Sequence, residues 1–122
     1  MAIQHVYSNH NNAAEYQVSS IPFVKAYSIG AGSTQHIELP FVSRFIVVST
    51  DVELRLGFSS AGVAGTNYFI VKAGTSPRLE IKCREFWLKN NTAGAATSSV
   101  LVGVTNVPHS QFPILDGIVG IG

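Results

Sequence analysis

Residues 51–58 read DVELRLGF, and residues 78–84 read RLEIKCR. In both runs apolar residues alternate with charged residues or glycine, so that Leu54 and Leu56 fall on one face and Arg55 on the other. Successive side chains of a β-strand point to opposite faces of the sheet. Each run therefore predicts a half-buried strand with one apolar face and one polar face.

Similar short runs fill the chain from Pro22 to Val107, and the loops between them consist almost wholly of Gly, Ala, Ser, Thr and Asn. Short strands joined by small-residue turns are typical of an antiparallel β-sandwich. We predict an all-β sandwich of jelly-roll type, while an immunoglobulin-like Greek key would have the same strand count and alternation. The Ala-rich stretches around Ala61 and Ala93 are rich in Gly and too short to predict helices. The eight predicted strands span approximately residues 22–29, 33–39, 42–49, 52–59, 67–73, 77–83, 85–90 and 98–105.

The chain of 122 residues is predicted to form one domain with two arms. Residues 1–20 are polar and predict an N-terminal arm, residues 21–107 predict the sandwich, and residues 108–122 predict a C-terminal tail. Disordered tails are normally polar, so an apolar tail should lie on something apolar. We expect it either to pack on its own sandwich as an extra edge strand or to cross to another subunit. Its apolar residues are Phe112, Ile114, Leu115, Ile118, Val119 and Ile121.

The composition is poor in charge. Charged residues make up 12% of the chain, about half of the ~25% that is usual in soluble domains, and the net charge is +1. This composition predicts no positively charged surface for binding nucleic acid or an anionic membrane. The mean hydropathy is positive, which favours burial of apolar surface against copies of the chain. We therefore expect a homo-oligomer, with a trimer as the first choice. Residues 1–17 lack a basic start followed by an apolar core, and no apolar run approaches ~18 residues, so we expect synthesis in the cytoplasm.

The potentially reactive side chains form no recognised catalytic or metal-binding motif. Cys83 is the only cysteine and falls on the apolar face of its run, so we expect it to be buried as a small hydrophobe. His36 and Glu38 share one face of a strand, a pattern that is able to chelate a metal but that here predicts a surface histidine. His5 and His10 lie in the N-terminal arm. We expect no enzyme activity, no cofactor and no structural metal.

Phe86 and Trp87 are adjacent, so a regular strand places them on opposite faces. Phe86 is in phase with Leu88 and should enter the core. Trp87 is then the candidate anchor for an interface or ligand, because exposed tryptophan is enriched at binding hot spots. The alternative is that a loop or the tail covers it. The residues predicted to be largely buried are Leu54, Leu56, Phe58, Leu79, Ile81, Phe86, Leu88, Val100 and Val102.

Several short motifs follow one another between residues 40 and 106. They are PFVSRF at 40–45, LRLGFS at 54–59, NYF at 67–69, RLEIK at 78–82, FWL at 86–88 and VLVGVTN at 100–106. In the order of these short motifs, the chain resembles a family of small β-sandwich proteins encoded beside tailed-phage capsid genes. The resemblance implies a virion component, such as a capsid decoration or cement protein of jelly-roll-like fold and trimeric assembly, with the major capsid protein as its partner.

The expected function is therefore that of a non-enzymatic capsid decoration protein of a bacteriophage, bound to the outside of the virion after synthesis in the host cytoplasm. Trp87 and the apolar residues of the tail are its candidate interface residues. A carbohydrate-binding, lectin-like module is the alternative, with Trp87 or Tyr68 as a stacking platform and loop Asn and Asp residues as hydrogen-bonding groups. A cupin-like enzyme would need a set of histidines around His36 that the sequence does not supply.

Overall fold

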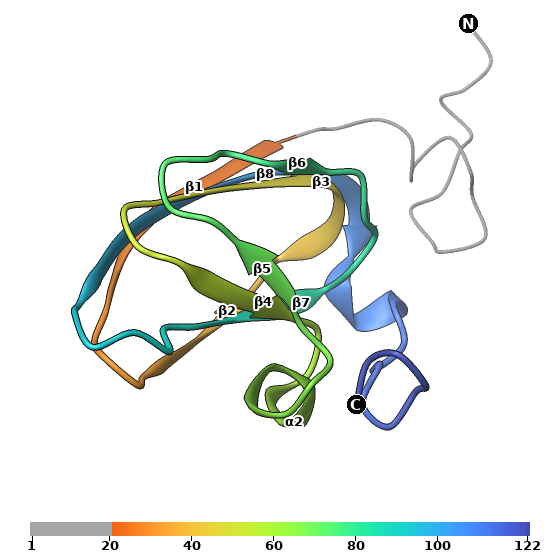
Figure 1. The fold of residues 1–122 in the computed structure, drawn as a ribbon. Coiled ribbons are helices and arrows are strands. Elements are labelled where there is room, and N and C mark those ends of the chain that lie inside the picture. Colours follow the sequence, from red (N-terminus) through yellow and green to blue (C-terminus); the bar gives the residue numbers. More distant parts are fainter. Residues whose placement is uncertain (1–20) are drawn as a thin grey trace, which may run out of the picture.

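The computed structural model describes residues 21–122. The predicted N-terminal arm, with His5 and His10, lies outside the described residues. Two antiparallel sheets of four strands each face one another, as Figure 1 shows. The first sheet contains, in spatial order, β1 (Ile21–Ile29), β8 (Ala96–Pro108), β3 (Phe41–Thr50) and β6 (Arg78–Leu79). The second contains β2 (Thr34–Glu38), β7 (Glu85–Lys89), β4 (Leu54–Gly57) and β5 (Phe69–Val71).

The order of the strands identifies the fold as a jelly roll. Every connection except that from β4 to β5 crosses from one sheet to the other, and the chain returns through β8 to lie between β1 and β3. The orders β1-β8-β3-β6 and β2-β7-β4-β5 are those of a jelly-roll double sheet. The prediction of an eight-stranded antiparallel sandwich is thus confirmed, and the strand order selects the jelly roll over the immunoglobulin-like arrangement.

A short helix that the sequence did not predict interrupts the strands. Helix α2 (Ser60–Ala64) begins after Ser59, whose Oγ accepts a hydrogen bond from the Gly62 amide at 2.9 Å. Its buried Val63 packs on the backbone of Gly57, where an added Cβ would lie 2.8 Å from the Val63 Cβ. A helix of five residues has little stability of its own. The serine cap and the close contact with Gly57 therefore stabilise it.

Strand β6 is shorter than the predicted strand at residues 77–83, because only Arg78–Leu79 pair with β3. Beyond Leu79, the side chain of Ser43 forms hydrogen bonds with backbone groups that would otherwise pair in the strand. The Ser43 hydroxyl donates to the Ile81 carbonyl at 2.6 Å and accepts from the Cys83 amide at 2.9 Å. These bonds satisfy two polar groups that a longer strand would have paired, so both remain hydrogen-bonded where the chain leaves the sheet.

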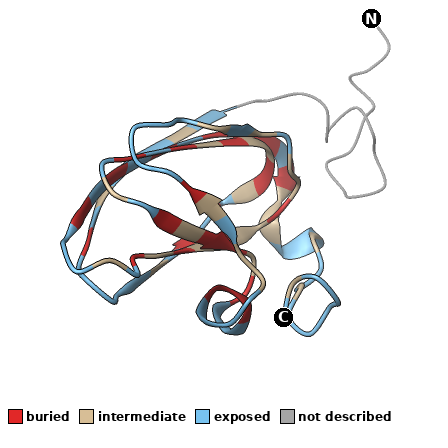
Figure 2. Cartoon of the chain, in the orientation of Figure 1, coloured by how far each residue is buried: buried red, intermediate tan, exposed pale blue. Residues whose placement is uncertain are grey.

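The core lies between the two sheets, and Figure 2 shows buried residues, in red, along the strands of both sheets. Six predicted core residues are buried: Leu54, Leu56, Phe86, Leu88, Val100 and Val102. Three others, Phe58, Leu79 and Ile81, are only half-buried, which corrects the prediction. Phe58 follows the end of β4, Leu79 belongs to an edge strand of two residues, and Ile81 follows that strand. Positions at the margin of a sandwich have neighbours on fewer sides than central ones, and this accounts for their exposure.

Cys83 is fully buried, as predicted, and burial raises the pKa of its thiol to about 11. We expect the native protein to resist a thiol reagent at about pH 8, whereas the unfolded protein reacts at once. The folded state favours the protonated thiol, so this contribution to stability is present below the ordinary pKa of 9.0 and is lost as the pH rises from there toward 11. Absorbance of the released chromophore, followed with and without guanidinium, measures the reaction. Rapid labelling of the native protein would contradict the burial of Cys83.

Candidate interaction surface

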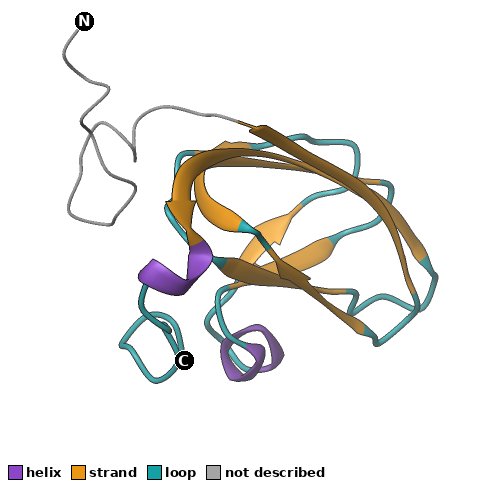
Figure 3. Ribbon diagram, turned by 180° about the vertical axis from the view of Figure 1, so that it is seen from behind, coloured by secondary structure: helices purple, strands orange, loops and turns teal. Residues whose placement is uncertain are grey.

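The C-terminal tail is held against its own chain where it leaves β8. The His109 amide donates to the Pro40 carbonyl at 3.2 Å, and His109 Nδ1 lies 2.8 Å from the Leu39 carbonyl oxygen. Further along, Arg84 Nη1 donates to the Phe112 carbonyl at 3.3 Å. The tail begins with the 3-10 helix η2 (His109–Gln111) and, within the described residues, adds no strand to either sheet, so an extra edge strand is not formed. Figure 3 shows η2 and α2 at the same end of the sandwich as the C-terminus.

Residues 115–122 fold into two successive tight turns, which we call the C-terminal turn. The Ile118 amide donates to the Leu115 carbonyl at 3.2 Å, and the Ile121 amide donates to the Ile118 carbonyl at 2.8 Å. Glycine occupies the third position of each turn, with φ of 83° in the first and 90° in the second. A type II turn requires a positive φ at this position, which glycine adopts without strain. Gly117 and Gly120 therefore serve to fold the tail back on itself.

The C-terminal turn is attached to helix α2 through a buried serine. Ser59 Oγ lies 3.0 Å from the Ile121 carbonyl oxygen and 2.8 Å from that of Gly122, so its single hydrogen is shared between the two. The same oxygen caps α2. The backbones also approach closely, because a Cβ added at Gly62 would overlap the Ile121 carbonyl oxygen. Ser59 and Gly62 thus fix the position of the end of the chain (Figure 1).

Attachment of the backbone leaves apolar side chains of the tail in solvent. Val119, in the second of the two turns, is 100% exposed, Ile114 is 64% exposed and Ile118 is 47% exposed. Phe112, Leu115 and Ile121 are half-buried. Three of the six predicted interface residues of the tail are therefore exposed, and two of these, Ile118 and Val119, belong to a turn whose backbone is hydrogen-bonded.

Trp87 lies on the outer face of the second sheet, and Phe86 enters the core, as predicted. The Trp87 ring is half-buried because the His36 ring stacks on it, with 4.3 Å between ring centroids and 4° between planes. His36 Nε2 also lies 2.8 Å from Glu85 Oε1. His36, on edge strand β2, is thus the predicted surface histidine, and it covers Trp87 where a loop or the tail had been considered. Within residues 21–122, no three His, Cys, Asp or Glu side chains are grouped to hold a metal ion.

Trp87 and the C-terminal turn are linked through helix α2. The helix packs on both β4 and β7, and Trp87 is paired in register with Gly57, the residue on which Val63 rests. The C-terminal turn is hydrogen-bonded to Ser59, the residue that caps α2. Trp87 and the C-terminal turn therefore both lie beside α2, an element that sequence reasoning missed.

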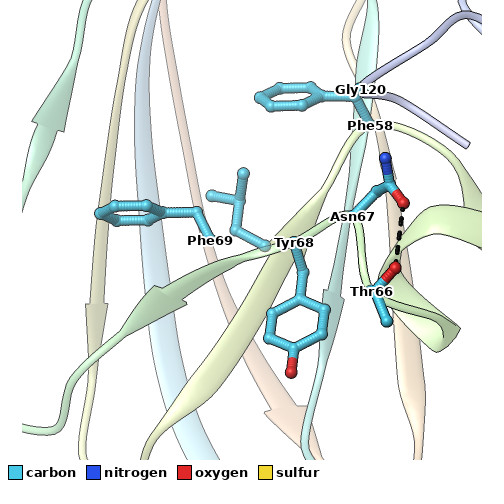
Figure 4. A pocket seen from close by; sticks show the side chains of 7 residues that line it. Phe58, Thr66, Asn67, Tyr68, Phe69 and Gly120 are labelled. Carbon is cyan, nitrogen blue, oxygen red and sulfur yellow. Dashed lines mark hydrogen bonds between the residues drawn. The ribbon is translucent and has the colours of Figure 1, made fainter.

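The structure also forms a hollow at the β5 edge of the sandwich that the sequence did not predict. It has a volume of about 360 Å³. We call it the aromatic hollow, and Figure 4 shows its lining residues, which are Leu56, Phe58, Thr66, Asn67, Tyr68, Phe69 and Gly120. The run NYF at 67–69 was the signal available in the sequence. Gly120 comes from a distant segment of the chain, so only the folded chain brings it beside this run.

Tyr68 is the other predicted stacking platform, and one face of its ring is partly covered by Arg55. The guanidinium carbon of Arg55 lies 4.2 Å from the centre of the Tyr68 ring, which is a cation–π contact. Phe69 is different, because it is 50% exposed on edge strand β5. Phe69 therefore presents more open ring surface in the hollow than Tyr68 does.

Comparisons with known proteins found structural likenesses at low sequence identity. No protein-family model and no curated protein sequence matches the chain. A de novo designed double-stranded β-helix is similar over 66% of this chain and 97% of its own, with 8% identity and a TM-score of 0.49. The Cupin_2 domain of an XRE family transcriptional regulator from Enterobacter cloacae is similar over 68% of this chain and 96% of its own, with 11% identity and a TM-score of 0.45. An oxalate oxidase is similar over 71% of this chain and 43% of its own, with 19% identity and a TM-score of 0.47.

Because all three TM-scores are below 0.5, these likenesses assign no activity to the chain, and the jelly-roll assignment rests on the strand order alone. None of these three proteins is described as a capsid decoration protein. The function of this chain must therefore be argued from its own surface.

Proposed function

We propose that the protein is a non-enzymatic capsid decoration protein that binds the major capsid protein on the outside of a virion. The observation that carries this proposal is the C-terminal turn, which holds Ile118 and Val119 in solvent on a hydrogen-bonded backbone. Large apolar side chains held in a fixed position are suited to a pocket on a partner. The motifs between residues 40 and 106, which resemble those of phage decoration proteins, suggest the kind of partner.

The physical advantage of the turn is that it is already ordered. A flexible tail loses conformational entropy when it binds, whereas a turn closed by its own hydrogen bonds loses much less. The Gly117 amide donates to the Gly122 carbonyl at 3.1 Å and closes the loop, and Ser59 secures it to α2. Several weak copies of such a contact give firm attachment to a repeating shell, because each bound copy raises the effective concentration of the next.

Self-association forms part of the proposal. A trimer would present three C-terminal turns to a local threefold of the capsid, and the low charge of the chain limits repulsion between its copies. Light scattering at micromolar concentration should give the mass of three chains. The mass of one chain would contradict the trimer. The capsid assay would then test whether single copies attach.

The attachment is tested by the double replacement of Ile118 and Val119 with Asp. We expect at least a tenfold loss of affinity for empty capsids, because a truncated or charged hot-spot residue commonly costs about 2 kcal/mol or more. Cosedimentation of the purified protein with capsids that lack it measures the affinity. The melting temperature should change little, since Val119 is fully exposed and Ile118, which is 47% exposed, is not a core residue.

The matched control is Val24→Asp. Val24 is also apolar and 68% exposed, but it lies on β1 in the first sheet, away from α2 and the turn. The control should bind capsids as the unaltered protein does. Full binding by the Ile118→Asp, Val119→Asp protein would exclude the C-terminal turn as the attachment site. Failure of the unaltered protein to bind any capsid would refute the proposed function itself.

A further inference from the structure

The aromatic hollow combines apolar ring surface with uncharged polar groups. Phe58 and Phe69 project to the same side in Figure 4, while the Tyr68 ring projects away from them. Phe69 is half-exposed, so part of a flat apolar face meets water. Small-molecule sites are commonly hollows of about 300–1,000 Å³ lined by aromatic side chains with a few polar groups, and the hollow, at about 360 Å³, falls within this range.

The polar groups of the hollow are oriented by the chain itself. Thr66 Oγ1 donates to Asn67 Oδ1 at 3.4 Å, and the Asn67 amide of the backbone donates to the Gly62 carbonyl at 3.1 Å. The side-chain nitrogen of Asn67 then points away from Thr66, toward Phe58 and Gly120 (Figure 4). No residue among those described between 21 and 122 accepts a hydrogen bond from this nitrogen. A primary amide carries two N–H donors, so the hollow offers unused donors beside an exposed ring.

The lining contains no charged side chain, and this restricts the class of ligand. An anion would find no positive side chain in the lining, and a cation would find no carboxylate. The adjacent positive charge, that of Arg55, is placed over the Tyr68 ring. A neutral sugar matches both features, because one face of its ring consists of C–H groups that pack on an aromatic face and its edge carries hydroxyls that accept from an amide.

We infer that the aromatic hollow is a binding site for a neutral saccharide, with Phe69 as the stacking platform and Asn67 as the hydrogen-bonding group. The site is separate from the apolar side chains proposed to bind the capsid, and it does not depend on that function. Only Gly120, in the C-terminal turn, belongs to both regions. A decoration protein with such a site would attach to the shell by the turn and hold a glycan at the edge of β5.

The test is a titration of the ¹⁵N-labelled full chain with maltose, cellobiose, lactose and N,N′-diacetylchitobiose, each up to about 10 mM. At least one of these neutral disaccharides should shift the amide resonances of residues 56–58, 66–69 and 120. Glucuronic acid and a proline-rich peptide are run beside them, because aromatic grooves also bind extended proline-rich segments. No shift with any neutral disaccharide would overturn the inference, and so would binding of the peptide alone.

Two variants locate the binding. Phe69→Leu keeps an apolar side chain on the edge strand but removes the flat ring, and it should weaken binding by at least about tenfold. Asn67→Ala removes the amide donors and should weaken it by about fivefold. Val24→Ala, on the other sheet, should change nothing. Unaltered affinity in a folded Phe69→Leu protein would refute the site, whereas the capsid assay with this variant should give the normal result.

Discussion

Replacing Phe86 with Ala is expected to lower the free energy of unfolding by about 3–5 kcal/mol, which is the usual loss for a large aromatic side chain in a core. Phe86 is 0% exposed and is the largest fully buried side chain of the described residues. Strand β7, which carries it, lies between β2 and β4, so its neighbours have little freedom to move into the vacated space. The loss combines the transfer energy of the ring with the cost of the cavity.

Urea denaturation followed by circular dichroism measures this loss. Phe69→Ala is the matched control, because it makes the same chemical change at a half-exposed ring on an edge strand, where we expect about 1 kcal/mol. A loss below about 1 kcal/mol for Phe86→Ala would mean that the faces of β7 are assigned the wrong way round, since a shift of one residue exchanges the two faces of a strand.

Replacing Gly62 with Ala is expected to separate the C-terminal turn from helix α2. Alanine ordinarily favours a helix over glycine by about 1 kcal/mol, so local propensity alone predicts a gain in stability. The added Cβ would overlap the Ile121 carbonyl oxygen, which is a backbone atom and cannot move without the turn. We therefore expect a net loss of about 1–3 kcal/mol, as for other overpacked sites. Release of the turn should also weaken capsid binding, because the turn is no longer held in place.

Hydrogen exchange measures the release, since the Ile121 and Gly122 amides are hydrogen-bonded within the turn and should lose protection together. Gly94→Ala is the matched control, because a Cβ at Gly94 meets no atom within 4 Å and its φ needs no glycine. Increased stability and unchanged exchange in Gly62→Ala would show that the contact with Ile121 does not constrain the turn.

The alternation of side chains is sufficient to predict the strands of this protein. The alternation in residues 51–58 and 78–84 predicts which side chains are buried, and it is a local property of the sequence. It also assigns Phe86 to the core and Trp87 to the surface correctly. It fails at the margins, where Phe58 and Ile81 keep the apolar phase but have too few neighbours to be buried.

The sites of function depend on contacts between distant segments. Helix α2 has a weak helical sequence and forms because Gly57 leaves room for Val63 and because Ser59 caps it. The same serine also bonds to Ile121, 62 residues further along the chain. The pairing of β2 with β7 places the His36 ring on Trp87, and no local pattern contains that information.

The sequence by itself thus determined the all-β class, the number and positions of the strands, and the apolar character of the tail, because each follows from the order of neighbouring side chains. Only the tertiary structure decided the jelly-roll strand order, the docking of the C-terminal turn and the aromatic hollow. The physical reason is that strand pairing and close backbone contacts depend on the shape complementarity of segments far apart in the chain. A periodic pattern states which face of a strand is buried but not which other strand buries it.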